Sequence, residues 1–239
     1  MTLMSNQLTD LHVVGSGCGA QCFPFYTYSK DGKVCHENIT DWALKKFQNN
    51  YGDDSISKWD IFYYNYGILH HPDYREKYRE DLKLNMPRIP FADDFWAFAK
   101  AGEQLADLHI NYESAPKYTG LTLKEKPNMP LDLRVEQMKL SKDKTRIQYN
   151  DFLSIEDIPV EAYNYRLGIR SALEWIIDQY KIKEDKDTKK HQGSYIINDP
   201  NREAEQRYIV DLIARVITVS LETVKIINNL PALYSVDED

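Results

Sequence analysis

Apolar residues recur along most of this chain at the spacing of a helix that is buried on one side. Trp59, Phe62, Tyr63, Tyr66 and Leu69 lie three or four positions apart, which predicts a helix over this stretch. The same spacing predicts further helices near residues 42–47, 72–82, 95–108 and 172–180, and a long one from Arg202 to about Asn229.

Alternating segments predict a small amount of strand. The first ends at Asp31-Gly32, a turn signal that predicts a hairpin near the start of the chain. Residues 133–150 predict a second hairpin with a polar turn at 141–144, and a short strand and a helical turn follow it over 152–168. The fold class that these elements predict is α+β, mostly helical, with a small antiparallel sheet and a long C-terminal helix.

Polar residues and prolines separate the predicted elements. Thr40 or Asp41 is expected to cap the first helix, and Ser171 to cap the helix over 172–180. Segment 85–91 has a proline on each side of Arg88-Ile89, which predicts an extended connector. Residues 115–132, rich in Pro, Lys and Gly, are predicted to form a loop.

The type of predicted secondary structure changes after His109, where loops and strands replace the run of helices. We therefore expect two parts, residues 1–112 and 113–239, that act as one functional module.

Composition narrows the classes of function. The 239 residues have a net charge of -7, which argues against an autonomous, non-specific nucleic-acid binder. Three cysteines do not suit a disulfide framework. Neither a signal peptide nor an apolar run of membrane-spanning length is present in the sequence, so a cytoplasmic protein without a membrane partner is expected.

Asp73, Asp81 and Lys83 spell the PD…DxK pattern of metal-dependent nucleases. That chemistry needs the two carboxylates on neighbouring strands, where they meet at one metal ion. Here the residues between them have helical spacing, and on one helix Asp73 and Asp81 would lie about 12 Å apart. A solvated helix face is the favoured interpretation, and a small nuclease is kept as a further alternative.

Other candidate sites also have ordinary structural interpretations. His12 to Ala20 resembles a glycine-rich cofactor loop but opens no predicted helix, so a glycine turn is favoured. Asn198 to Asn201 lacks the second proline and the aromatic residue of amino-methyltransferase motifs, and is interpreted as the cap and first turn of the long helix. We predict neither catalysis, cofactor nor metal for this chain; the weak zinc candidates are Cys18, Cys22, Cys35 and His36.

Basic residues surround two tyrosines and the proline-framed connector. They are Arg75, Lys77, Arg79, Lys83 and Arg88. Arginine donates to guanine edges or to phosphates, so this cluster suits contact with DNA. Nearby carboxylates nearly cancel its charge, and pairing within the helix is an equally good interpretation of the same residues.

Several blocks of the sequence, in order, resemble one known family. They are CFPFYTY at 22–28, the segment 62–113, YNYRLGIRSALEWIIDQY at 163–180 and the segment 208–231. Together they resemble the C-terminal specificity region of single-polypeptide restriction–modification enzymes of the type ISP, or LlaGI-like, class. The resemblance spans about Gln21 to Pro231. It implies a region that reads an asymmetric DNA sequence while other domains methylate one adenine or drive ATP-dependent cleavage.

The resemblance implies double-stranded DNA as a partner, together with the methyltransferase and helicase–nuclease domains of a parent enzyme. Residue chemistry adds five candidates on the second hairpin: Arg134, Lys139, Arg146, Gln148 and Asn150. Arg170, Glu174 and Trp175 are interpreted as a buried Arg–Glu pair beneath an indole. The alternative function is a helical protein-interaction module that docks its long C-terminal helix on a methyltransferase or motor partner.

Overall fold

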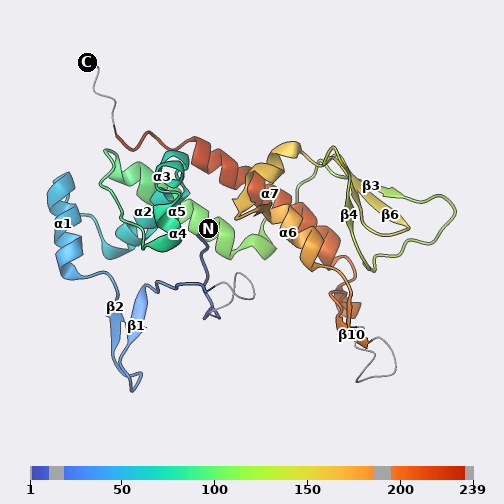
Figure 1. Cartoon of the computed structure of the whole chain (residues 1–239), viewed down its shortest axis with the longest axis horizontal. Coiled ribbons are helices and arrows are strands. Elements are labelled where there is room, and N and C mark those ends of the chain that lie inside the picture. Colours follow the sequence, from blue (N-terminus) through green and yellow to red (C-terminus); the bar gives the residue numbers. More distant parts are fainter. Residues whose placement is uncertain (1, 11–18, 186–194, 235–239) are drawn as a thin grey trace, which may run out of the picture. The chain divides into compact units, whose positions relative to one another are not determined.

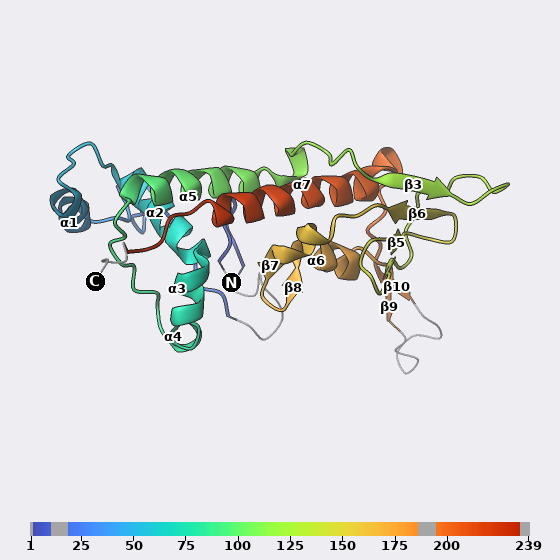
Figure 2. The same cartoon turned by 90° about the horizontal axis from the view of Figure 1, so that it is seen from above.

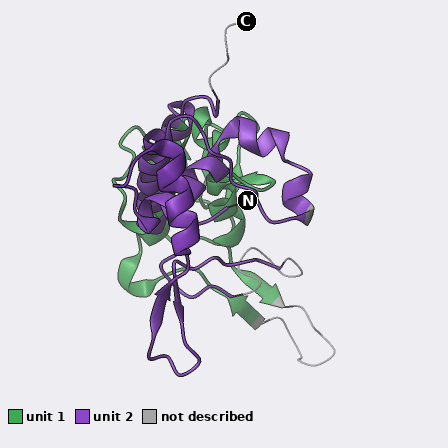
Figure 3. Ribbon diagram, turned by 90° about the vertical axis from the view of Figure 1, so that its left-hand side faces the viewer, with its two compact units in different colours: residues 1, 111–224 green, residues 2–110, 225–239 purple. Residues whose placement is uncertain are grey.

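The computed structural model describes residues 2–10, 19–185 and 195–234, and it confirms the α+β class (Figure 1). The chain divides into two compact units (Figure 3). Unit 1 comprises residues 111–224, and unit 2 comprises residues 2–110 together with residues 225–239. The expectation that they act as one functional module stays a prediction.

Unit 2 begins with the predicted hairpin. Strands β1 (Tyr26–Tyr28) and β2 (Cys35–Glu37) pair antiparallel, and Gly32 turns between them with a φ of 71° that favours glycine. The helices of this unit are α1 (Asp41–Tyr51), α2 (Lys58–His70), α3 (Pro72–Lys77), α4 (Asp81–Leu84) and α5 (Phe95–Ile110). Thr40 is the cap of α1, because its hydroxyl accepts a hydrogen bond of 3.1 Å from the backbone of Ala43.

Helices α2 and α5 form the core of unit 2, and glycines let their backbones approach closely. A Cβ atom on Gly102 would lie 1.8 Å from the carbonyl oxygen of Tyr63, so an alanine there would separate the helices. Tyr64 is fully buried beside Phe95, with ring centroids 4.9 Å apart. Its hydroxyl donates to the carbonyl of Pro90, which fixes the connector 85–91 to the core.

The predicted helix over 72–82 is two short helices instead. Tyr78 ends α3 with φ of -108° and ψ of 21°, and α4 begins only at Asp81. The connector that follows has the extended course that its prolines predict.

Unit 1 contains a four-stranded antiparallel sheet in the order β3-β6-β5-β4. The second predicted hairpin forms its β4–β5 edge. The loop prediction for 115–132 is wrong in part, because β3 lies within it and pairs with β6. The strands are β3 (Thr122–Glu125), β4 (Lys139–Leu140), β5 (Ile147–Gln148) and β6 (Leu153–Glu156).

Helix α6 (Ala172–Gln179) follows a short hairpin of β7 (Arg166–Leu167) and β8 (Arg170–Ser171). Ser171 caps α6 as predicted: its hydroxyl accepts from the backbone of Glu174, whose carboxylate accepts from the backbone of Ser171. The remaining elements of unit 1 are η1 (Tyr112–Ser114), η2 (Val160–Asn164), β9 (Lys183–Asp185), β10 (Tyr195–Asn198) and η3 (Glu203–Glu205).

The long helix α7 (Tyr208–Asn228) starts six residues later than predicted. Asn201 is not part of its first turn. The Asn201 side chain instead accepts from the backbone N–H of Val135 and donates to its carbonyl oxygen, each at 2.8 Å. The apolar stripe of α7 lies in the core of unit 1, where Leu212, Ile213 and Ile217 are completely buried. Within the described residues, no helix combines the length and the apolar character needed to cross a membrane.

Candidate nucleic-acid interface

The nuclease-like residues lie on two short helices. Asp73 belongs to α3, whereas Asp81 and Lys83 belong to α4, and neither helix is part of a sheet. The Lys83 ammonium donates to Glu80 at 2.7 and 2.9 Å and thereby holds the pKa of that carboxyl below its usual range. Lys83, the lysine that a nuclease would use at its metal centre, therefore forms an ion pair with Glu80.

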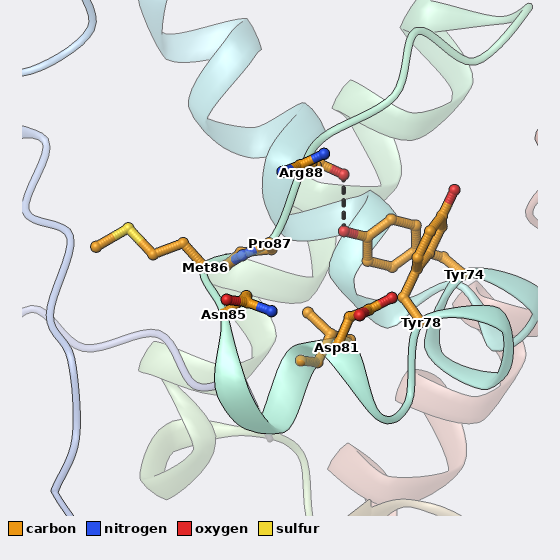
Figure 4. A pocket seen from close by; sticks show the side chains of 8 residues that line it. Tyr74, Tyr78, Asp81, Asn85, Met86, Pro87 and Arg88 are labelled. Carbon is orange, nitrogen blue, oxygen red and sulfur yellow. Dashed lines mark hydrogen bonds between the residues drawn. The ribbon is translucent and has the colours of Figure 1, made fainter.

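A cavity of about 500 Å³ lies between these helices and the connector (Figure 4). Its aromatic wall is Tyr74 and Tyr78, whose ring centroids are 4.9 Å apart. Tyr74 is buried, and its hydroxyl donates to the backbone carbonyl of Arg88 at 2.9 Å. Asp81, Asn85, Met86 and Pro87 contribute to the remaining lining. The connector follows α4 in sequence and is tied at Arg88 to the preceding helix, α3.

The five cations of this region differ in what their side chains contact. Arg79 pairs with Glu76, and Lys83 with Glu80, as the interpretation of pairing within the helix expects. The Lys77 ammonium lies 5.5 Å from the centre of the Tyr78 ring. The exposed Arg75 and Arg88 form no ion pair within the part of the chain that the structure describes.

The second group of candidates lies on and beside the β4–β5 hairpin of unit 1. Lys139 pairs in register with Gln148, and Arg146 directly precedes β5. Lys139 and Arg146 are exposed, and no ion pair involving either occurs among the described residues. Arg134 instead pairs with Asp199 at 2.6 Å. Of the three candidate cations in this group, Lys139 and Arg146 therefore have side chains available for an anionic ligand.

The two amides of the hairpin have different surroundings. The Asn150 side chain donates to the carbonyls of Asp132 and Arg134 at 2.7 and 2.8 Å, and accepts from the backbone of Phe152 and Leu153 at 2.9 Å each. These four bonds hold the loop between β5 and β6. Gln148 uses its amide nitrogen for the carbonyls of Asn150 and Leu153, at 2.7 and 3.3 Å.

The ten candidates therefore fall in two groups, each described within its own unit. Arg75, Lys77, Arg79, Lys83 and Arg88 belong to unit 2, and Arg134, Lys139, Arg146, Gln148 and Asn150 to unit 1.

The predicted Arg170–Glu174 pair is wrong. Arg170 donates to Asp178 at 2.7 Å and lies 5.2 Å from the centre of the Trp175 ring. Glu174 instead pairs with Lys144 at 2.8 Å while it caps α6, and these bonds lower the pKa of its carboxyl to about 2 against the opposing effect of burial. The capping role of Glu174 was readable from its position three residues after Ser171, and in the structure its carboxylate accepts from the backbone N–H of Ser171.

The zinc candidates Cys22 and Cys35 are exposed free thiols, and His36 follows Cys35 on β2. Cys18 and most of the glycine-rich segment from His12 to Ala20 lie outside the described residues.

One feature of unit 1 was missed by sequence reasoning. Ile169 is 82% exposed in the turn between β7 and β8, directly after Gly168. The sequence carried one signal for this exposure: Ile169 is a β-branched apolar residue that follows a glycine and lies between two arginines.

Comparison with known proteins identifies the family. Residues 1–212 match the type ISP C-terminal specificity domain. Among solved structures, LlaGI, a type ISP restriction–modification enzyme studied as a nuclease-deletion mutant with a DNA substrate mimic, is 36% identical; the alignment covers 100% of this chain and 20% of that one, with a TM-score of 0.75. No match was found among curated proteins.

Two further structures agree. The ATP-dependent type ISP enzyme LlaBIII, bound to DNA, is 34% identical over 87% of this chain and 13% of its own, with a TM-score of 0.72. DrdV in complex with DNA is 37% identical over 96% of this chain and 23% of its own, with a TM-score of 0.80. The chain thus spans about a fifth of the LlaGI chain. It belongs to the family of type ISP C-terminal specificity domains.

Proposed function

We propose that this chain recognises a DNA sequence on behalf of a type ISP restriction–modification enzyme. The observation that carries the proposal is the match of residues 1–212 to the specificity-domain family. LlaGI, LlaBIII and DrdV, which are 34 to 37% identical to this chain, were each solved with DNA or a DNA substrate mimic. The proposed partners are double-stranded DNA and the methyltransferase and helicase–nuclease domains of a parent enzyme, which methylate adenine and cleave DNA.

The chain itself is proposed to be non-catalytic. Asp73 and Asp81 lie on different short helices, and Lys83 is paired with Glu80. Metal-dependent phosphodiester cleavage needs carboxylates that converge on one ion beside an available lysine. The geometry of α3 and α4 suits a scaffold for the connector better than it suits that chemistry.

The proposed DNA contacts rank by the availability of their side chains. Arg75 and Arg88 in unit 2, and Lys139 and Arg146 in unit 1, are exposed and pair with no carboxylate in the described residues. Such side chains gain a phosphate or a guanine edge without losing another partner. Arg79, Lys83 and Arg134 must first leave their carboxylates, so each is expected to contribute less. Lys77 would leave only the face of Tyr78.

Among the amides, Gln148 is the better candidate for reading a base. Its amide nitrogen is engaged, whereas its amide oxygen accepts no hydrogen bond from the described residues and so can accept one from an exocyclic amino group. Asn150 uses both ends of its amide to hold the loop beside Gln148. We propose that Asn150 reaches a base only if that loop opens.

The packing in unit 1 weakens the alternative of a helical protein-interaction module, which the acidic net charge favours. That alternative docks the long C-terminal helix on a methyltransferase or motor partner. Leu212, Ile213 and Ile217 are already buried in the core of unit 1. A helix whose apolar face is covered by its own unit offers little apolar surface to another protein.

The proposal is tested by measuring the affinity of the chain for a duplex of about 30 base pairs as the salt concentration rises from about 50 mM. Binding by a chain of net charge -7 is expected to be weak and to weaken with salt. Arg88→Ala and Arg146→Ala should each reduce the steepness of the log–log salt dependence by up to about 0.9, the value for one lost phosphate contact. Lys33→Ala, which removes an exposed cation from the β1–β2 turn, is the matched control. Binding that is unaffected by either arginine substitution would contradict these assignments.

A further inference from the structure

Strands β7 and β8 form a short hairpin next to helix α6 (Figure 2). Its turn contains an exposed apolar residue, Ile169. Leu167 pairs with Arg170, so Gly168 and Ile169 form the two-residue turn. Gly168 has a φ of 75°, which only glycine adopts without strain, and fixes the course of the turn. Ile169 is 82% exposed. Turns of this kind usually have small polar residues at their centre, so isoleucine is an unusual occupant.

The tip is held in place by several bonds to its own base and to α6. The indole N–H of Trp175 donates to the carbonyl of Leu167 at 3.0 Å. The backbone N–H of Ala172 donates to the carbonyl of Tyr165, also at 3.0 Å. The guanidinium of Arg166 donates to the carbonyl of Ile169 itself. Ile169 is therefore exposed on a fixed turn and not on a loose loop.

The charges around the tip favour an anionic partner. Segment 163–171 contains Arg166 and Arg170 but no carboxylate. Arg170 is balanced by Asp178, and Arg166 makes no ion pair in the residues that the structure describes. An isolated exposed apolar residue is ordinary on a protein surface. A rigidly held apolar side chain beside an exposed arginine, however, resembles the apolar wedges and basic residues with which minor-groove proteins enter a base stack.

We propose that Ile169 acts as a wedge that inserts between two base pairs of bound DNA from the minor groove, while Arg166 contacts the adjacent backbone. This inference rests on the proposed function in that it takes DNA as the ligand, and it adds a site of DNA deformation. The wedge would favour flexible pyrimidine–purine steps, which unstack at the lowest cost. Recognition would thereby include a contribution from DNA deformability as well as from base-edge contacts.

The test compares two duplexes of about 30 base pairs that differ only by one central abasic site. An abasic site leaves a gap in the stack, so a wedge enters it without breaking a complete stacking contact. The wild-type chain is expected to bind the abasic duplex roughly ten-fold more tightly than the intact one. Ile169→Ala should lose this preference, and Ile169→Leu should retain most of it.

Val160→Ala is the matched control, because Val160 is a half-exposed apolar residue of the same unit outside the hairpin. Thermal unfolding of each variant shows whether the fold is kept, and a folded Ile169→Leu with retained preference supports the wedge. If Ile169→Ala keeps both the affinity and the preference of the wild type, the wedge is wrong, and a protein contact becomes the better role for the tip. If the wild type binds neither duplex, the proposed DNA recognition fails together with the wedge.

Discussion

The hydroxyl of Tyr74 donates a hydrogen bond of 2.9 Å to the backbone carbonyl of Arg88, across 14 residues of sequence. Tyr74 is only 1% exposed, whereas Arg88 is exposed. The bond therefore connects the core of unit 2 to an exposed arginine that prolines on either side help to hold. This arrangement places a candidate contact residue on a backbone that is fixed before any ligand arrives. A fixed backbone reduces the conformational entropy that is lost on binding.

Tyr74→Phe removes this hydrogen bond and keeps the ring. The free energy of unfolding is expected to fall by about 0.5–1.5 kcal/mol, the usual net value of one such bond. Because the connector is also less well fixed, DNA affinity should fall by a small factor. Chemical denaturation and DNA titration measure the two effects. Tyr78→Phe is the control, since its hydroxyl makes no hydrogen bond in the described residues. Equal stability of Tyr74→Phe and wild type would show that the bond does not hold the connector.

Asn150→Ala is expected to be the most destabilising substitution among the ten candidates. It removes four hydrogen bonds around the loop between β5 and β6 and leaves partly buried backbone groups without partners. The expected loss is about 2–3 kcal/mol in the free energy of unfolding, measured with denaturant. Asp151→Ala, at the exposed neighbouring position, should change stability by less than about 0.5 kcal/mol. A stable Asn150→Ala variant with altered DNA preference would instead assign Asn150 a direct role in reading bases.

His70 predicts a dependence of stability on pH. It is 3% exposed, and burial lowers its pKa to about 4 even though its ring nitrogen Nδ1 lies 2.8 Å from the carbonyl of Tyr66. Below the usual pKa of about 6.5, the unfolded chain takes up a proton that the folded chain does not. Stability contributed by the neutral ring is therefore complete above about pH 6.5 and is lost as the pH falls toward 4, at about 1.4 kcal/mol per pH unit.

His70→Gln should reduce this pH dependence of the unfolding free energy, whatever its effect on stability at neutral pH. His109 adds a similar contribution, because burial lowers its pKa to about 3. The measurement is a series of denaturant titrations between about pH 7 and pH 5. The same slope in His70→Gln and wild type would contradict a neutral buried His70.

The isolated chain is expected to leave supercoiled plasmid DNA intact in the presence of Mg²⁺ or Mn²⁺. The reason is the separation of Asp73 and Asp81 on two helices and the pairing of Lys83 with Glu80. Gel electrophoresis after prolonged incubation checks this. Cleavage by the wild type that disappears in Asp81→Ala would overturn the interpretation of this region as a scaffold.

Local chemistry made parts of the fold readable from the sequence. The hydroxyls of Thr40 and Ser171 predicted two helix starts, and Asp31-Gly32 and the polar turn at 141–144 predicted two hairpins. Pairing within the α3–α4 region was readable because Glu76 and Arg79 lie one helical turn apart. In each case the residues that decide the structure are close neighbours in the sequence.

Features that depend on distant partners were not readable. Strand β3 lies in a Pro- and Lys-rich segment, and its pairing with β6 joins residues about thirty positions apart. Asn201 is a residue type that often caps helices, and it directly precedes the predicted start of the long helix. Its side chain instead bonds to the backbone of Val135, and α7 starts later, at Tyr208. Arg170 had Glu174 four residues further along the chain, but Glu174 caps α6 and pairs with Lys144. Arg170 pairs instead with Asp178, eight positions away.

The candidate contact residues also include some that the sequence could identify and some that it could not. Residue type alone nominated Arg75, Arg88, Lys139 and Arg146, and the structure describes each of these side chains as exposed. Residue type also nominated Asn150, whose tertiary hydrogen bonds give it a structural role in its loop. Ile169 was overlooked because sequence patterns treat an isoleucine as a candidate for the core, and only the structure shows it in an exposed turn.

We propose above all that this region reads the DNA sequence for its parent enzyme. This proposal is tested most directly by grafting the chain onto a type ISP relative from which the C-terminal region has been removed, and mapping methylated adenines across the genome. The graft is expected to methylate a new sequence, different from that of the relative, and Gln148→Ala is expected to relax the preference at one position by about 1–3 kcal/mol. A folded, active graft that keeps the relative's original site, or that methylates without site preference, would contradict the account.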